Sequence, residues 1–416
     1  MSATTPIPEL GWRAKAASRV LATAPTTQKD AGLLAAADLL GDRTGDLLTA
    51  NAHDVARAEA DGMAPTVIDR LRLTESRVEA MAEGLRQVAV LPDPVGQVLD
   101  GWVRPNGLRI SRVRVPLGVV AIIYENRPNV TSDAAGLCLK SGNTAFLRGS
   151  SGAIGSNLAI STVLREAYTK VELPADALVL VDDTSRHAAV EFMRQRDTID
   201  CLIPRGGPSL IGSILDNATV PFVIDGDGNC HVYVDAAADL EMAARIIHNA
   251  KTQRPSVCNA AETLLVHRAV AEGFLAGLAE VLPGVELVAD GATRQLLPNA
   301  TEATEADWTD EFLDLRLAVK VVDDLDAAIA HIDHYGSGHS EAIVTGDLHA
   351  ADRFTREVDA AAVVVNASTR FVDGEEFGFG AEIGISTQKL HARGPMGLRE
   401  LTTAKYVVRG EGQTRA

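Results

Sequence analysis

The sequence predicts an α/β protein in which parallel sheets are covered by helices on both faces. Short apolar runs typical of strands alternate with helical patterns from residue 118 to residue 367. Strands that are apolar throughout, and separated by helices, are typical of buried parallel sheets. A polar, glycine-rich break, DGDGN at 225–229, divides the series. Because 416 residues exceed one ordinary domain, we expect two α/β units with a boundary at this break.

The elements are expected in the following order. Residues 11–91 are helical: leucines recur near helical spacing in 32–60, and Thr74 is a plausible N-cap for a helix that ends near Val88. The first unit then has strands at 118–124, 143–149, 177–181, 199–203 and 220–224, with helices at 131–142, 156–168, 185–195 and 208–216. The second has strands at 230–235, 263–267, 317–324, 341–345 and 361–367, with helices at 239–250, about 268–282, 325–334 and before the last strand.

The segment 101–118 does not fit either series. Its residues alternate on both sides of Pro105-Asn106-Gly107, which predicts a β-hairpin. A basic hairpin that leaves a run of helices is a candidate oligomerisation arm, and an ordinary surface hairpin is equally compatible with the pattern.

Composition excludes several classes of partner. The net charge of −17 argues against nucleic acid and anionic membranes, which both require a basic surface. No signal peptide follows Met1, and no apolar run approaches the roughly 18 residues of a membrane helix. The four cysteines are far apart and form neither a disulfide framework nor a zinc pattern. We therefore expect a protein of the reducing cytoplasm.

One cysteine differs from the others. In QRPSVCNAAETLLV (253–266), Cys258 stands just outside the apolar run, where a loop would meet a strand. Cations such as Lys251 and Arg254 favour the thiolate form of a nearby cysteine. Its neighbourhood is compatible with a nucleophile and equally with a packing residue, whereas Cys138, Cys201 and Cys230 lie in patterns typical of buried packing.

Two turns between a strand and a helix are candidate phosphate sites. LRGSSGAIGSN (147–157) and LIPRGGPSLIG (202–212) both offer backbone N–H groups at a helix start, where ligands of parallel sheets bind. Ordinary βα turns are the alternative. The GxGxxG fingerprint is absent, and GSSGAIGS (149–156) lacks the Lys-Ser/Thr of a P-loop. His331, His334 and His339 are expected at a solvated helix end rather than on a metal.

Several stretches together resemble one family. They are VPLGVVAIIYENRPNVTSDAAGLCLKSGNTAFLRG, LIPRGG, GDGNCHVYVD, QRPSVCNAAETLLVH and HSEAIVTGD. They are similar to the gamma-glutamyl phosphate reductases of the aldehyde dehydrogenase superfamily. The resemblance implies an aldehyde dehydrogenase-like fold: a Rossmann-like NADPH-binding domain (1–100 and 119–225), a catalytic α/β domain (226–395), and a β-hairpin oligomerisation flap (101–118 and 396–416).

The resemblance also implies chemistry. Such an enzyme reduces L-glutamyl 5-phosphate with NADPH in the second step of proline biosynthesis. Cys258 matches the nucleophile, whose thiolate would attack the acyl phosphate carbonyl and form a thioester. The donor to the developing oxyanion matches Asn126, with Asn129 close enough in sequence to be the donor instead.

Cofactor and substrate residues follow in the same way. Arg148 matches a lysine that contacts the adenosine ribose. Ser151 replaces a glutamate that would repel a 2′-phosphate, which suits NADPH. The further cofactor candidates are Gly149, Ser150, Pro204, Arg205, Gly206, Gly207 and Glu311, and the candidate substrate residues are Arg127, Arg254 and Ser256.

One departure concerns hydrolysis. Oxidative relatives carry a glutamate that activates water, and the matching position here is Ile224, beside Asp225. Losing that base suits a reductase, although Asp225 or Asp227 could replace it. An oxidative semialdehyde dehydrogenase and a non-catalytic nucleotide-binding scaffold are the alternatives. We expect a homo-oligomer, and a transient complex with glutamate 5-kinase is a hypothesis.

Overall fold

The computed structural model describes residues 5–224 and 226–415. The chain forms two compact units. Unit 1 contains the described chain up to Ile224, together with Gly378–Gly384 and the described chain from Met396 on. Unit 2 contains residues 226–377 together with Ile385–Pro395. The segment 378–384 thus packs with unit 1. The sequence assigned this segment to the catalytic domain, because a contact between segments far apart in the chain leaves no periodic signal.

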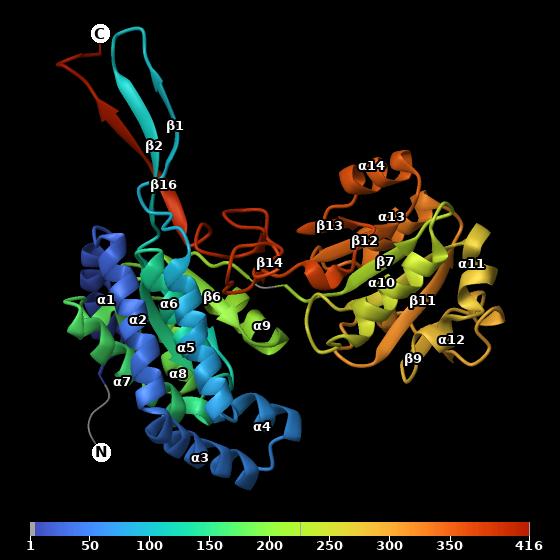
Figure 1. Cartoon of the computed structure of the whole chain (residues 1–416), viewed down its shortest axis with the longest axis horizontal. Helices are drawn as coiled ribbons and strands as arrows, with labels where there is room; N and C mark the ends of the chain where they lie inside the picture. Colours follow the sequence, from blue (N-terminus) through green and yellow to red (C-terminus); the bar gives the residue numbers. More distant parts are fainter. Residues whose placement is uncertain (1–4, 225, 416) are drawn as a thin grey trace. The chain divides into compact units, whose positions relative to one another are not determined.

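Unit 1 begins with helices (Figure 1). They are α1 (Ile7–Leu21), α2 (Thr26–Asp42), α3 (Thr44–Ala60), α4 (Pro65–Leu71) and α5 (Glu75–Val90). Thr74 caps α5 as predicted, since its side chain accepts a hydrogen bond from the Arg77 N–H at 3.2 Å. The leucine-rich stretch 32–60 is divided between α2 and α3 at Arg43.

A parallel sheet forms the centre of unit 1, with strand order β5-β4-β3-β6. Alternate residues of β3 pack with α1, α8 and α9 in one apolar cluster, while α6 and α7 cover the other face and α2 packs outside them. The elements are β3 (Val119–Tyr124), α6 (Asn129–Lys140), β4 (Thr144–Gly149), α7 (Ile154–Lys170), β5 (Leu178–Leu180), α8 (Arg186–Phe192), β6 (Cys201–Arg205) and α9 (Pro208–Asn217). The predicted strand at 220–224 is wrong: only an isolated bridge joins Leu202 and Phe222.

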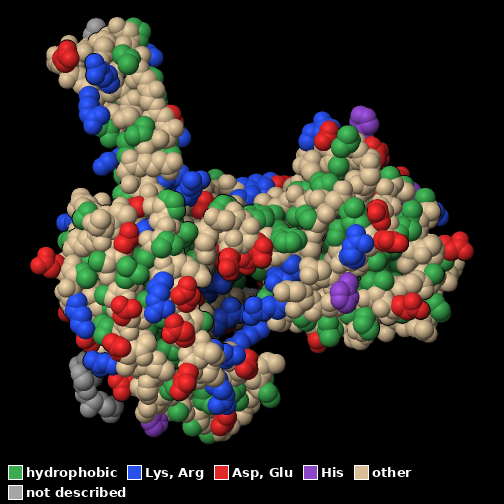
Figure 2. Space-filling view, viewed as in Figure 1, with side chains coloured by type: hydrophobic (Ala, Val, Ile, Leu, Met, Phe, Trp, Pro, Cys, Tyr) green, Lys and Arg blue, Asp and Glu red, His purple; other side chains and the backbone are tan. Residues whose placement is uncertain are grey.

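A three-stranded antiparallel arm projects from unit 1 (Figures 1 and 2). It consists of β1 (Val98–Val103), β2 (Arg109–Pro116) and β16 (Thr402–Arg409). The turn between β1 and β2 needs Gly107 because its φ is +86°. Large apolar side chains are exposed on the arm, among them Trp102 and Tyr406, whose rings meet edge to face.

Unit 2 contains a seven-stranded parallel sheet of order β10-β9-β11-β8-β7-β12-β13. One face packs with α10, α11 and α12, and the other with α13 and α14. The elements are β7 (Cys230–Val234), α10 (Leu240–Thr252), β8 (Ala261–His267), α11 (Arg268–Leu275), α12 (Leu278–Val281), β9 (Glu286–Ala289), β10 (Thr301–Glu302), β11 (Arg316–Val322), α13 (Leu325–Tyr335), β12 (Ser340–Val344), α14 (Leu348–Glu357) and β13 (Ala362–Val365), followed by the small ladder of β14 (Ile385–Ser386) and β15 (Gly394–Pro395). Strands β9 and β10 were not predicted, because they are short and weakly apolar.

The prediction of a solvated helix end around the histidines holds for His334, which is exposed in the last turn of α13, and is wrong for the other two. His331 and His339 are buried. The ring of His331 packs between those of Trp308 and Tyr335, and burial lowers the pKa of His331 to about 3, with His231 and Lys320 adding to the effect. Within 5–224 and 226–415, no helix is both long and apolar enough to cross a membrane.

Candidate active site

Three of the predicted site segments meet at the carboxyl edge of the unit 1 sheet. Strand β3 pairs with β4 on one side and β6 on the other, so that Tyr124 stands opposite Gly149 and Arg205. The segments that follow these three strands are therefore neighbours. This edge is where parallel α/β sheets bind ligands.

The two candidate oxyanion donors behave differently. Asn126 has a left-handed backbone, with φ at +39°. Its N–H donates to Ser150 Oγ at 3.1 Å, and that hydroxyl in turn donates to Asn126 Oδ1 at 2.7 Å. The hydrogen bond to Oδ1 thus fixes the orientation of the Asn126 side-chain amide. No described residue accepts a hydrogen bond from its Nδ2. By contrast, Asn129 Nδ2 donates to Asp133 at 2.9 Å, so this amide already has an acceptor.

Arg148, near the end of β4, bonds the segment that leads into α8. Arg148 Nη2 donates to the carbonyl oxygens of Thr184 and Ser185, both at 2.9 Å. The guanidinium is nearly buried, and its Nε has no partner within the described residues. Burial lowers the pKa of Arg148. Ser151, three residues further along the chain, is exposed, so its hydroxyl is available to a polar ligand at this turn.

Sequence reasoning missed the residues that hold this turn against helix α3. Asp54 is buried and accepts from the N–H and the hydroxyl of Ser156 at 2.7 Å each. Arg57 pairs with Asp54 at 2.5 Å and donates to the Ser151 carbonyl at 3.1 Å. Only the charge of these two residues could have drawn attention to them, since nothing in a helical pattern indicates a partner nearly a hundred residues away.

The turn after β6 places Pro204 and Arg205 at the strand end and Gly206 and Gly207 before helix α9. The Gly207 N–H donates to the Glu125 carboxylate at 3.2 Å. A Cβ on Gly206 would lie 2.8 Å from the same carboxylate. The turn therefore already receives an oxyanion, and its donor set fits the pyrophosphate of a dinucleotide. The sequence did not indicate this role for Glu125.

In unit 2, Cys258 lies in a half-buried turn between α10 and β8, as its place in the sequence predicted. The other three cysteines are buried, as expected. Cys230 Sγ donates to the Cys258 carbonyl at 3.1 Å, and Asn259 Nδ2 donates to the Val372 carbonyl at 2.9 Å. Contacts on both sides of the thiol thus fix the backbone that carries it.

Gly228 explains the glycine-rich break at 225–229. A Cβ at Gly228 would overlap the backbone of Cys258, so only glycine fits there. The Gly228 N–H donates to the Glu311 carboxylate at 3.0 Å. Glu311, a cofactor candidate, therefore lies near the cysteine loop through this glycine. Asp225 is outside the described residues, and Asp227 is exposed.

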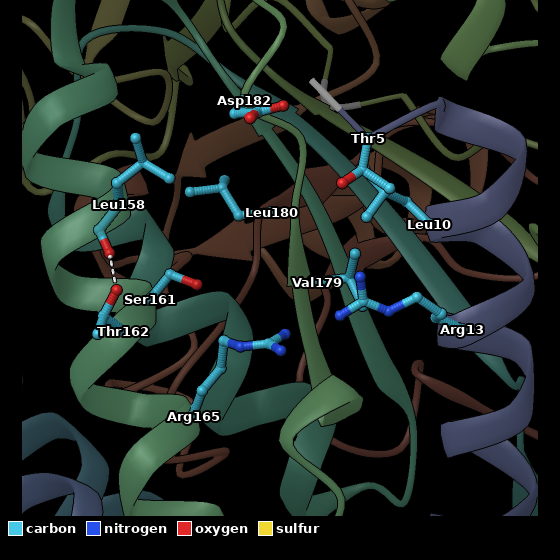
Figure 3. A pocket seen from close by; sticks show the side chains of 10 residues that line it. All are labelled: Thr5, Leu10, Arg13, Leu158, Ser161, Thr162, Arg165, Val179, Leu180 and Asp182. Atoms are coloured by element: carbon cyan, nitrogen blue, oxygen red, sulfur yellow. Dashed lines mark hydrogen bonds between the residues drawn. The ribbon is translucent and has the colours of Figure 1, made fainter. Parts of the chain in front are cut away.

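The substrate candidates are divided between the units. Arg127 follows β3 in unit 1, whereas Arg254 and Ser256 are exposed on the Cys258 loop of unit 2. A cavity of about 220 Å³ lies elsewhere in unit 1, between α1, α7 and β5 (Figure 3). It contains none of the predicted site residues, and its two arginines, Arg13 and Arg165, both bind Asp176. We assign it no part in the chemistry.

Comparison with known proteins identifies the family of this fold. The aldehyde dehydrogenase family model matches residues 8–295. A gamma-glutamyl phosphate reductase of Carboxydothermus hydrogenoformans is 59% identical over 408 residues, covering 98% of each chain. The crystal structure of the Thermotoga maritima gamma-glutamyl phosphate reductase is 49% identical, with a TM-score of 0.97, and covers 99% of this chain and 100% of that one. An engineered glycolyl-CoA reductase with bound NADP⁺ shares the fold, at 16% identity and a TM-score of 0.69 over 98% of each chain.

The parallel sheets, the cysteine loop and the family match define the class: the chain belongs to the aldehyde dehydrogenase family. Full-length similarity then places it among the gamma-glutamyl phosphate reductases, which are oxidoreductases of proline biosynthesis.

Proposed function

We propose that this enzyme reduces L-glutamyl 5-phosphate to L-glutamate 5-semialdehyde with NADPH, through a thioester on Cys258. The observation that carries the proposal is the position of this thiol. It lies half-exposed on a loop whose backbone is fixed by Cys230, Gly228 and Asn259. A held, accessible thiol is what a covalent mechanism requires.

The covalent steps balance without water. The Cys258 thiolate attacks the acyl carbon, the bond from this carbon to the phosphate oxygen breaks, and phosphate leaves with the electron pair. NADPH, when bound, would supply a hydride to the thioester carbon. The resulting thiohemiacetal anion then collapses to the aldehyde as its carbon–sulfur bond breaks, which releases the Cys258 thiolate. Ile224 at the position of the hydrolytic glutamate favours this reductive course, because no carboxylate there activates water.

We propose Asn126, rather than Asn129, as the side-chain donor to the oxyanion. The Ser150 hydroxyl orients the Asn126 amide so that its Nδ2 points away from that hydroxyl, whereas Asp133 already accepts from the Asn129 amide. A preoriented donor stabilises developing charge more than one that must first leave another acceptor.

Unit 1 supplies the proposed dinucleotide site. The N–H groups at the start of α9, around Gly206 and Gly207, would hold the pyrophosphate, displacing the Glu125 carboxylate. Arg148 and Ser151 would face the adenosine ribose, and a serine there leaves room for the 2′-phosphate of NADPH. Glu311 in unit 2 is the proposed partner of the nicotinamide ribose.

The arm formed by β1, β2 and β16 is the proposed oligomerisation element, because it exposes large apolar side chains such as Trp102, Val103 and Tyr406, which a second copy of the chain would cover. A transient complex with the kinase that makes the labile acyl phosphate also remains a proposal, which co-elution of the two proteins would test. A cytoplasmic location follows from the same biosynthetic role.

The reverse reaction tests the function. We expect NADP⁺ reduction with glutamate 5-semialdehyde to require phosphate and to vanish in Cys258→Ala. Activity that needs only water would contradict the proposal and favour an oxidative dehydrogenase. Ser151→Glu tests the cofactor assignment separately: we expect kcat/KM for NADPH to fall at least ~10-fold relative to that for NADH, since a carboxylate repels the 2′-phosphate.

A further inference from the structure

Arg370, which lies beyond β13, contacts the cysteine loop at two points. Its Nε donates to Gln253 Oε1 at 2.8 Å, and its Nη1 donates to Asn259 Oδ1. Gln253 and Asn259 stand on either side of Cys258 in the sequence. The guanidinium therefore spans the loop that carries the thiol, although Arg370 is more than a hundred residues away along the chain.

Both acceptors of Arg370 are neutral amides, so its charge is not balanced by these contacts. Within 5–224 and 226–415, neither Arg370 nor its neighbour Arg254 forms a salt bridge, and no acceptor for Arg370 Nη2 is found. The carboxylate of Asp373, the nearest acidic group in the segment, accepts instead from the N–H groups of Glu375 and Glu376. Two guanidiniums thus stand at the loop without a bound carboxylate.

The electrostatics agree with this geometry. Burial lowers the pKa of Arg370, and the positive charge of Arg254 lowers it further, while Asp373, Cys258 and Glu376 act in the opposite direction. Placing two cations together is unfavourable unless an anion joins them. The thiol is close enough to be among the groups that influence Arg370.

We propose that Arg370 and Arg254 bind the phosphoryl group of the acyl phosphate beside the Cys258 thiol, which rests on the function proposed above. Phosphate carries close to two negative charges and is attached to the carbon that the thiolate attacks. The α-carboxylate carries one charge, stands beside an ammonium group and lies at the far end of the substrate. Two unpaired cations at the thiol therefore fit the phosphoryl group, and they would also stabilise its charge as it leaves.

The first test varies phosphate in the reverse reaction. In Arg370→Gln we expect the KM for phosphate to rise about 10- to 100-fold, as for the loss of charge-assisted hydrogen bonds. The KM values for the semialdehyde and NADP⁺ should stay within about twofold of wild type. Arg370→Lys keeps the positive charge but loses the planar guanidinium with its several N–H donors, so its KM for phosphate should lie between those of the wild type and Arg370→Gln. Arg356→Gln, an exposed arginine of α14, is the matched control and should change nothing.

A second readout does not depend on turnover. Inorganic phosphate should slow alkylation of Cys258 by iodoacetamide in the wild type, and Arg370→Gln should abolish this protection. Calorimetric titration of phosphate into Cys258→Ala should still detect binding, because it needs no reaction at the thiol. The phosphate site and the thioester function can therefore fail separately.

Three results would overturn the assignment. Phosphate could fail to protect the wild-type thiol. The semialdehyde KM could rise in place of the phosphate KM, which would make Arg370 a carboxylate-binding residue. Lastly, kcat and the alkylation rate could fall together at an unchanged phosphate KM, in which case Arg370 only braces the loop.

Discussion

Lys251 and Glu262 form a fully buried ion pair in unit 2, and breaking it is the most quantitative test of the structure. Lys251 Nζ lies 2.6 Å from Glu262 Oε2, and both side chains are inaccessible to solvent. The second carboxylate oxygen accepts from the Leu313 N–H at 3.3 Å. Burial raises the pKa of Glu262 to about 7 even with Lys251 beside it.

In Lys251→Met the carboxyl group loses the cation that lowers its pKa, so this pKa rises further and the group stays protonated in the folded state at neutral pH. Removing one partner of a buried pair costs about 3–5 kcal/mol in general. We therefore expect the free energy of unfolding of unit 2 to fall by about 3–5 kcal/mol at pH 7.5, with a loss of roughly 6–20 °C in its melting temperature.

The loss should depend on pH in a defined direction. The folded variant holds the Glu262 proton more tightly than the unfolded chain does. The stability that comes from this proton is therefore fully present below the ordinary pKa of 4.5 and is lost as the pH rises through the raised pKa. The deficit of Lys251→Met should therefore shrink by several-fold between pH 7.5 and pH 5.

Thermal and guanidinium unfolding at the two pH values measure this deficit. Lys389→Met, which breaks an exposed pair with Asp359, is the matched control and should cost less than ~1 kcal/mol. The double variant Lys251→Met/Glu262→Met should recover most of the stability, because no charge remains buried. A deficit below ~1 kcal/mol, or one that is equal at both pH values, would refute the reasoning.

Three further predictions address the site and the arm. Asn126→Ala should lower kcat about 10²–10³-fold while Asn129→Ala changes it only several-fold; equal losses in steady-state assays would reject Asn126 as the preferred donor. Gly228→Ala should abolish activity and alkylation of the Cys258 thiol, because the new Cβ would overlap the Cys258 backbone. The control Gly273→Ala on helix α11 has room for a Cβ and should stabilise the fold by up to ~1 kcal/mol. A normal alkylation rate in Gly228→Ala would contradict this packing. Tyr406→Asp on the arm should reduce the oligomer measured by light scattering, and an unchanged mass would exclude this surface from the interface.

The sequence by itself determined the alternation of strands and helices, the division near residue 225 and the position of Cys258 at the end of a loop. Each of these is local: a parallel strand is apolar over a few consecutive residues, the apolar positions of a helix repeat every three or four residues, and Cys258 stands just outside an apolar run. Weak local signals failed, as at residues 220–224, which are apolar but pair through a single bridge.

Only the tertiary structure decided which polar groups meet. Ser150 orients Asn126, Glu125 faces the glycine turn before α9, and Arg370 reaches Asn259 from 111 residues away. The same holds for His331, which the sequence placed in solvent and the fold buries against Trp308. A hydrogen bond between distant side chains depends on how strands pair and helices pack, and neither register nor packing is written in the spacing of residues along the chain.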